Sequence, residues 1–202
     1  MAKVLILFAH PGQQHSRINT RAASVAATFS GTTFVDLYAE YPRFKIDIDR
    51  EQKALVAHDA IIMQFPLYWY STPSLLKEWQ DLVLEFGFAY GPGGDALKGK
   101  LLLPVITAGG AETAYQADGQ NNFLLRTLLA PLEQTANLCQ MQFIPPLVLF
   151  GAHQAGKDGR DEQHIAQYRT IVSAISEDRF DIKAARERSL LTDGPLPVRE
   201  SI

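Results

Sequence analysis

The sequence predicts a doubly wound α/β fold, in which helices cover both faces of a parallel sheet. Short apolar runs of strand length alternate along the chain with amphipathic segments of helix length. The apolar runs are nearly continuous, which is typical of strands that are buried on both faces of a sheet. Helices that separate successive strands also imply parallel order with right-handed crossovers.

Five strands and five helices make up this alternation. The apolar runs place the strands at Val4–Phe8, Thr33–Leu37, Ala60–Phe65, Leu101–Thr107 and Phe143–Phe150. The amphipathic segments place the helices at Ser16–Phe29, Arg50–Ala57, Ser71–Glu85, Asn122–Leu138 and Glu162–Ile175. Five such units predict a five-stranded, flavodoxin-like parallel sheet in a three-layer α/β/α arrangement.

A change of composition after Asp178 marks the expected end of the domain. The residues beyond it include a charged run at Asp181–Arg188 and then Gly194-Pro195-Leu196-Pro197, which cannot continue a helix. We therefore expect one flavodoxin-like domain at residues 1–178 and a charged C-terminal tail at residues 179–202. The sequence leaves open whether that tail is disordered or lies across a partner subunit.

Composition and charge exclude several classes of function. The net charge of −3 provides no electrostatic basis for binding nucleic acid. No apolar run approaches the roughly 20 residues that a membrane span requires, so we expect a cytoplasmic protein. The single cysteine, Cys139, excludes an internal disulfide, and the scattered histidines lack the spacing of metal ligands. We expect no metal site.

The loop after the first strand has the composition of an anion site. It contains Ala9-His10-Pro11 and then Ser16-Arg17-Ile18-Asn19 at the start of a helix. The N–H groups at a helix N-terminus lack partners and favour negative charge, most often a phosphate. The alternative is that Ser16 only caps the helix and His10-Pro11 only forms a turn.

Two further loops follow strands at the same edge of the predicted sheet. Leu67-Tyr68-Trp69-Tyr70 follows the third strand and offers aromatic faces on which a planar ring can stack. Thr107-Ala108-Gly109-Gly110 follows the fourth strand, and its glycines allow close approach of backbone N–H donors to a ligand. Taken singly, the aromatic residues could anchor a helix or form a dimer contact, and the glycines could form a plain turn.

Several motifs, taken together, carry a resemblance to a known family. They are Ala9-His10-Pro11 with Ser16-x-x-Asn19, the segment from Gln64 to Trp79, the glycine-rich stretch Gly87–Lys100, and Thr107-x-Gly109-Gly110. Over residues 4–168 the chain resembles the flavodoxin-like NAD(P)H:quinone oxidoreductases. Within them it is most similar to the ancillary proteins of bacterial glutathione-regulated potassium-efflux systems.

The resemblance implies an FMN cofactor, with FAD as the alternative, and assigns each loop to one part of it. The contacts on the phosphate side correspond to His10, Ser16, Arg17, Ile18 and Asn19. Those along the isoalloxazine correspond to Leu67, Tyr68, Trp69 and Tyr70. The opposite edge of the ring corresponds to Thr107, Ala108, Gly109 and Gly110.

Tyr115 is the catalytic candidate that the resemblance implies. It stands at the distance from the glycine pair at which members of the family keep a tyrosine beside the flavin. Better-known members have a histidine six residues later, whereas this chain has Asn121. That difference puts a tyrosine–histidine proton relay in doubt.

The implied reaction is hydride transfer from NAD(P)H to the flavin, followed by two-electron reduction of a quinone in the same pocket. The resemblance also implies a homodimer, and the aromatic residues in the glycine-rich stretch are consistent with one. The alternative function is that of a regulatory subunit that activates a glutathione-gated potassium antiporter. In that role the protein would lie peripherally at the inner membrane.

Overall fold

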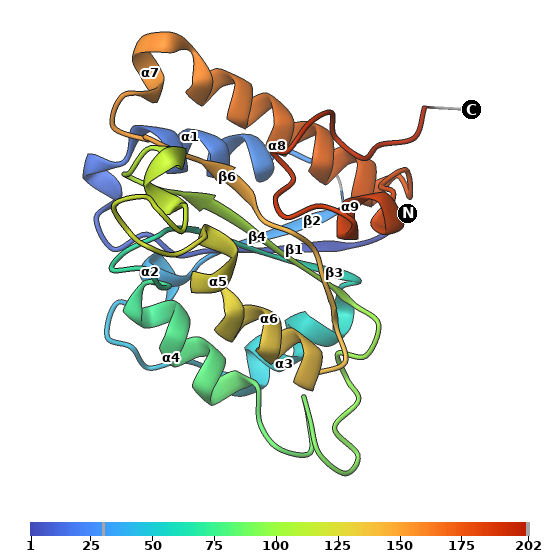
Figure 1. Ribbon diagram of the computed structural model, residues 1–202. Helices are drawn as coiled ribbons and strands as arrows, with labels where there is room; N and C mark the ends of the chain where they lie inside the picture. The colour runs from blue at the N-terminus through green and yellow to red at the C-terminus, as the bar shows by residue number, and fades with distance from the viewer. Residues whose placement is uncertain (30, 201–202) are drawn as a thin grey trace.

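A computed structural model describes residues 1–29 and 31–200 as a sheet between two layers of helices (Figure 1). The strands are β1 Val4–Phe8, β2 Thr32–Asp36, β3 Ala60–Pro66, β4 Leu101–Thr107, β5 Gln142–Phe143 and β6 Leu147–Leu149. They pair in the order β2-β1-β3-β4-β5, with β6 also beside β4, and all of these pairings are parallel. The predicted flavodoxin-like, three-layer fold is thus confirmed.

The helices divide between the two faces of the sheet. One face is covered by α1 Arg17–Ala26, α7 Ala155–Asp158, α8 Arg160–Ser176 and α9 Ile182–Arg186 (Figure 1). The other is covered by α2 Leu37–Glu40, α3 Ile48–Ala57, α4 Ser74–Val83, α5 Leu125–Leu128 and α6 Ala130–Leu138. Two short 3₁₀ helices complete the set, η1 Gln13–His15 and η2 Glu112–Tyr115.

The central strands supply both hydrophobic cores. In β1, Leu5 and Leu7 belong to the core beneath α4, whereas Val4 and Ile6 belong to the core beneath α8. Successive side chains of a strand point to opposite faces, so a continuous apolar run fills both cores at once. This explains why the apolar runs predicted β1 and β4 to the residue.

Two predicted elements are interrupted, and proline is the common cause. The expected fifth strand is divided into β5 and β6 at Pro145-Pro146, which have no N–H to donate to a neighbouring strand. The expected helix at residues 122–138 is divided into α5 and α6, and Pro131 lies in the first turn of α6. At Asn122 the backbone is left-handed, with φ 58°, so no helix begins there.

Residues 179–200, which the sequence assigns to a tail outside the core, contribute buried side chains. Phe180, Ala185 and Leu191 pack in the core beneath α8, and Leu190 packs in the core on the opposite face. The N–H of Leu191 donates to the carbonyl of Pro146 at 2.9 Å. This segment therefore covers the outer edge of the sheet at the point where the prolines interrupt it; residues 201–202 lie outside the described part of the chain.

Candidate flavin site

The three predicted loops meet at the carboxyl edge of the sheet, where direct hydrogen bonds join them. Asn19 Nδ2, in the first turn of α1, donates to Thr107 Oγ1 at the end of β4, at 2.8 Å. The N–H of Leu67, just after β3, donates to the Thr107 carbonyl, also at 2.8 Å. Thr107 thus holds the phosphate-side loop and the aromatic loop in one place.

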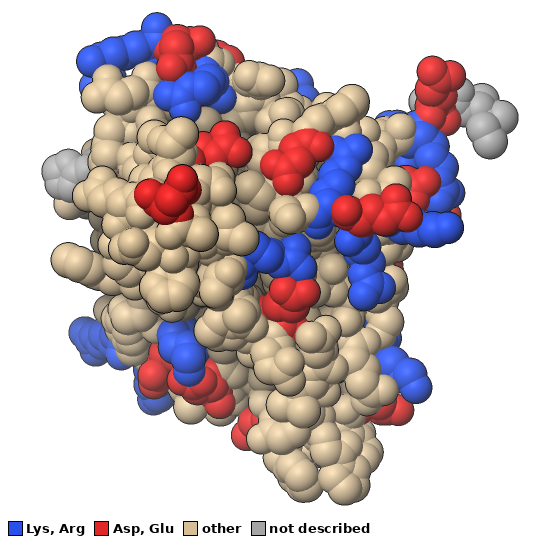
Figure 2. Space-filling model, viewed as in Figure 1, with Lys and Arg blue, Asp and Glu red and all other residues tan. Residues whose placement is uncertain are grey.

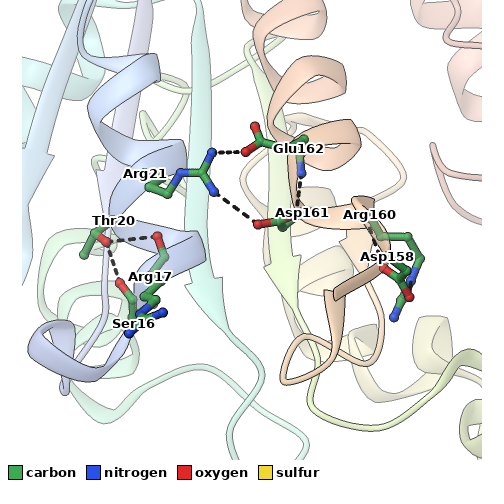
Figure 3. Close-up of polar contacts among 8 residues, drawn as sticks. All are labelled: Ser16, Arg17, Thr20, Arg21, Asp158, Arg160, Asp161 and Glu162. Atoms are coloured by element: carbon green, nitrogen blue, oxygen red, sulfur yellow. Dashed lines mark hydrogen bonds and ion pairs between the residues drawn. The ribbon is translucent and has the colours of Figure 1, made fainter. Parts of the chain in front are cut away.

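The N-terminus of α1 has no side-chain cap. Ser16 occupies the N-cap position, but its side chain makes no capping hydrogen bond, and the first turn of the helix contains no acidic residue. Thr20 donates to the carbonyls of Ser16 and Arg17 (Figure 3). Arg17 is exposed and Ile18 is half-buried at the same turn.

Arg21, one turn further along α1, is already engaged by acidic residues. It forms ion pairs with Asp161 and Glu162 at the start of α8, so that it bridges the two helices (Figure 3). Arg160, beside them, pairs with Asp158. The positive charge nearest to the open end of α1 and outside this network is therefore that of Arg17.

His10 shapes the turn after β1 and also contacts the aromatic loop. It is buried, and its Nδ1 accepts a hydrogen bond from the N–H of Gly12 at 3.1 Å. Burial lowers the pKa of His10 below its ordinary value, so the ring is neutral near pH 7 with its proton on Nε2. The ring of Tyr68 meets it edge to face, with 6.0 Å between centroids.

The aromatic loop is a strained two-residue turn. Tyr68 and Ser71 exchange backbone hydrogen bonds at 3.1 and 3.0 Å. Between them Trp69 and Tyr70 have φ angles of 46° and 64°, the left-handed geometry of a type I′ turn that normally uses Asn and Gly. Trp69 is 93% exposed, whereas Leu67 is buried in the core. Strain of this kind in bulky residues is typical of functional sites.

The glycine loop is held by the loop that follows β6. The carbonyls of Ala108 and Gly110 accept from the N–H groups of Ala152 at 3.0 Å and Gly151 at 2.8 Å. Ala108 is buried between these contacts. Within the described residues, the N–H of Gly109 donates to no backbone carbonyl, so it is free to bind a ligand.

Side chains closely border the space in which the two glycines would carry a methyl group. A Cβ at Gly110 would lie 3.2 Å from Cε2 of Tyr115, and a Cβ at Gly109 would lie 3.2 Å from Nε2 of His153. A residue of any other type would require these rings to shift by a few tenths of an ångström. The structure therefore explains the glycine pair by close packing as well as by ligand access.

Tyr115 lies beside this loop and is nearly buried. Its ring packs against Phe150, with 5.5 Å between centroids, and burial raises the pKa of its phenol above the ordinary value. The phenol therefore remains protonated at neutral pH. Asn121 accepts a hydrogen bond from the hydroxyl of Tyr70 at 3.3 Å. A cavity of about 220 Å³ adjoins Tyr115 on the side of Leu125 and Leu190.

Sequence reasoning did not select two residues that the structure places at this edge. Gln64 in β3 is buried, and its Nε2 donates to the carbonyl of Asn19 at 2.8 Å. A polar amide within an otherwise apolar strand could have identified Gln64 from the sequence. His153, set aside as one of several scattered histidines, lies over Gly109. The sequence offered one indication of its role, because it stands three residues after the end of the expected fifth strand.

Another hollow lies on the C-terminal segment. A larger hollow of about 670 Å³ lies among charged residues of the C-terminal segment, between Phe180 and Arg199. Within residues 1–29 and 31–200 there is no group of His, Cys, Asp and Glu side chains that could hold a metal ion. No helix in the same part of the chain has the length and apolarity of a membrane span.

Comparison with known proteins places this geometry in a family. The ancillary protein KefG of the glutathione-regulated potassium-efflux system of Cronobacter sakazakii is 50% identical over 76% of this chain and 83% of its own. General stress protein 14 of Treponema denticola, solved in complex with FMN, is 34% identical with a TM-score of 0.80, covering 86% of this chain and 99% of that one.

Two further solved structures carry different functional names. An NADPH-quinone reductase from P. pentosaceus is 32% identical, with a TM-score of 0.75 over 83% of this chain and 95% of that one. A structure described as a thermophilic tryptophan halogenase from Streptomycin violaceusniger is 44% identical, with a TM-score of 0.79 over 82% and 95%. Residues 2–172 match the family described as Flavodoxin-like fold. The chain therefore belongs to this flavodoxin-like family, together with the KefG ancillary proteins.

Proposed function

We propose that the protein is an FMN-dependent NAD(P)H:quinone oxidoreductase. The observation that carries the proposal is the row of open groups along one edge of the sheet. An uncapped helix start, an exposed aromatic turn and a glycine with a free N–H lie on three loops joined through Thr107. Such groups suit the phosphate, the ring face and the ring edge of FMN.

The residues present fit this cofactor. The first-turn N–H groups of α1, with Ser16 and Arg17, would bind the phosphate, and Tyr68, Trp69 and Tyr70 would lie along the ring. The N–H of Gly109 would meet the pyrimidine edge. FMN is favoured over FAD because Arg21, the next cation along α1, is already paired with Asp161 and Glu162 and is not available to a second phosphate.

For Asn19 we propose a role that differs from the one the resemblance implies. Its side-chain amide donates a hydrogen bond to Thr107, and its backbone carbonyl accepts one from the side chain of Gln64. We assign it to positioning the start of α1 rather than to donating a hydrogen bond to the phosphate. His10, through its contacts with Gly12 and Tyr68, positions the turn in the same way.

The overall reaction converts NAD(P)H, a proton and a quinone into NAD(P)⁺ and a hydroquinone. When bound, a flavin would supply the redox chemistry, which is hydride transfer from the nicotinamide and two-electron reduction of the quinone. The hydride carries one proton equivalent and the second proton comes from solvent. Tyr115, kept protonated by burial, would donate a hydrogen bond to the reacting oxygen atom.

Flavin binding and turnover test this proposal directly. The purified protein, stripped of small molecules, would be titrated with FMN and FAD while flavin fluorescence is followed. NADH and NADPH oxidation would then be measured with a simple naphthoquinone. We expect tighter binding of FMN than of FAD, and oxidation that requires both flavin and quinone. A protein that binds neither flavin would disprove the proposal.

A second role, as a regulatory subunit of a potassium-efflux antiporter, is supported by the identity with KefG. A protein in this role would be cytoplasmic and would lie at the inner membrane through its transporter. Two measurements would test it, recovery of the protein with antiporter-containing membranes and restoration of efflux in a strain without its own ancillary subunit. Normal membrane recovery without restored efflux would exclude activation.

We also propose a homodimer. The loop between α4 and β4 projects from the lower end of the molecule in Figure 1, and Figure 2 shows no charged side chain at its lower tip. Phe86 on this loop is 66% exposed, and Trp69 in the aromatic loop is 93% exposed. Exposed aromatic residues of this kind are commonly covered by a partner. Light scattering on the purified protein would distinguish a dimer from a monomer.

A further inference from the structure

His153 lies beside Gly109 because of how its loop is attached. After β6 the chain runs through Phe150-Gly151-Ala152 to His153, and the N–H groups of Gly151 and Ala152 both donate to the glycine loop. These two hydrogen bonds end on either side of Gly109. The next residue along the chain, His153, is thereby carried to Gly109 itself.

Two further features fix the course of this loop. Arg160 donates from its guanidinium to the carbonyl of Phe150, which fixes the start of the loop to α8. Gly151 has a left-handed backbone, with φ 59°, which turns the chain back toward the glycine loop. The position of His153 therefore follows from main-chain contacts.

The imidazole is placed to act on a ligand rather than to support the fold. His153 is exposed, and its Nε2 would lie 3.2 Å from a methyl group at Gly109, the glycine with the free N–H. Tyr115 occupies the equivalent position at Gly110. Two side chains with polar hydrogen atoms thus flank the glycine pair, one from η2 and one from the loop after β6.

We propose that His153 contacts the bound flavin beside Gly109 and donates a hydrogen bond from Nε2 to the pyrimidine edge of the ring. This inference rests on the proposed FMN-binding function. A donor at this edge binds the reduced ring more strongly than the oxidised ring, because reduction adds negative charge there and hydrogen bonds to charged groups are stronger. His153 therefore sets the reduction potential of the flavin.

The test compares His153→Ala and His153→Gln with the wild type. The readouts are the dissociation constant of oxidised FMN and the two-electron midpoint potential of the bound flavin. We expect the alanine variant to bind oxidised FMN within about twofold of wild type. Its binding of reduced FMN should be about tenfold weaker, which corresponds to a potential lower by about 30 mV. The glutamine variant, which keeps a donor, should recover most of this shift.

The matched control is Gln154→Ala, the next residue in the same exposed loop, whose side chain caps no helix. Its potential should equal that of the wild type. If the wild type binds FMN and the alanine variant has an unchanged potential, the role of His153 is disproved and the proposed function stands. If the wild type binds no flavin, both proposals fail.

Discussion

The site combines two regions built in opposite ways. Its floor, formed by Asn19, Gln64 and Thr107, is buried and joined by hydrogen bonds between α1, β3 and β4. Its rim, formed by Tyr68, Trp69 and Tyr70, is exposed and has strained backbone. The floor stabilises the fold and sets the distance between loops. The rim costs stability and offers surface to a ligand or partner.

The largest effect is expected between floor and rim, at Gly110. In Gly110→Val the new side chain collides with Tyr115, and overpacking of this kind costs about 1–3 kcal/mol. FMN binding should weaken roughly fivefold to 150-fold if that cost falls on the bound state. Titration of the purified variant with FMN measures it.

The control for this variant is Gly156→Ala in α7. A methyl group there makes an ordinary contact, 3.6 Å from Asp161 Oδ2, and lies outside the site. Its FMN affinity should match that of the wild type. Equal affinities for all three proteins would show that the glycine loop does not bind the cofactor.

The floor is tested by Asn19→Ala. The substitution leaves the hydroxyl of Thr107 without its buried partner, and such a loss destabilises a protein by about 1–3 kcal/mol. Urea unfolding of the flavin-free protein measures the change. Ser24→Ala, on the exposed side of the same helix, should stay within about 0.5 kcal/mol of wild type. Equal midpoints for both variants would contradict a stabilising floor.

The rim is tested by the double variant Trp69→Asn with Tyr70→Gly. Asn and Gly adopt left-handed backbone with little strain, so the flavin-free protein should gain about 1 kcal/mol in its free energy of unfolding. FMN binding should weaken at the same time, because the aromatic faces are gone. Opposite signs in the two measurements would support the contrast between floor and rim; a loss of stability would contradict it.

The smallest effect concerns pH and His10. Burial lowers the pKa of His10 in the folded protein, so the unfolded chain binds a proton more readily below about pH 6.5. The contribution of His10 to the free energy of unfolding is present above that pH. It is lost as the pH falls toward the pKa of His10 in the folded protein. Burial also lowers the pKa of His164, to about 4. Its contribution to the stability of the folded protein is therefore lost in the same direction, as the pH falls.

The relevant measurement is therefore the difference between wild type and His10→Gln. Urea unfolding at several pH values between about 7 and 5 should show a shallower loss of stability in the variant. Parallel pH profiles for the two proteins would mean that His10 is not protonated on unfolding in this range. His164 is unchanged in both proteins, so its contribution cancels.

Prediction from the sequence succeeded where short-range pattern decides the outcome. The continuous apolar runs of β1 and β4 identified both strands to the residue, because central strands of a parallel sheet are buried on both faces. It failed where backbone geometry overrides hydrophobicity. Pro145-Pro146 lies within an apolar run that reads as one strand, yet the structure has two. The buried Leu190 and Leu191 were likewise hidden within a charged segment.

The sequence by itself determined the fold class and the edge of the sheet at which the three predicted loops meet. These follow from the order of strands and helices along the chain. Only the tertiary structure decided that Ser16 leaves α1 uncapped, that Asn19 turns inward to Thr107 and that His153 lies over Gly109. Each of these depends on contacts between segments far apart in sequence, about which local periodicity carries no information.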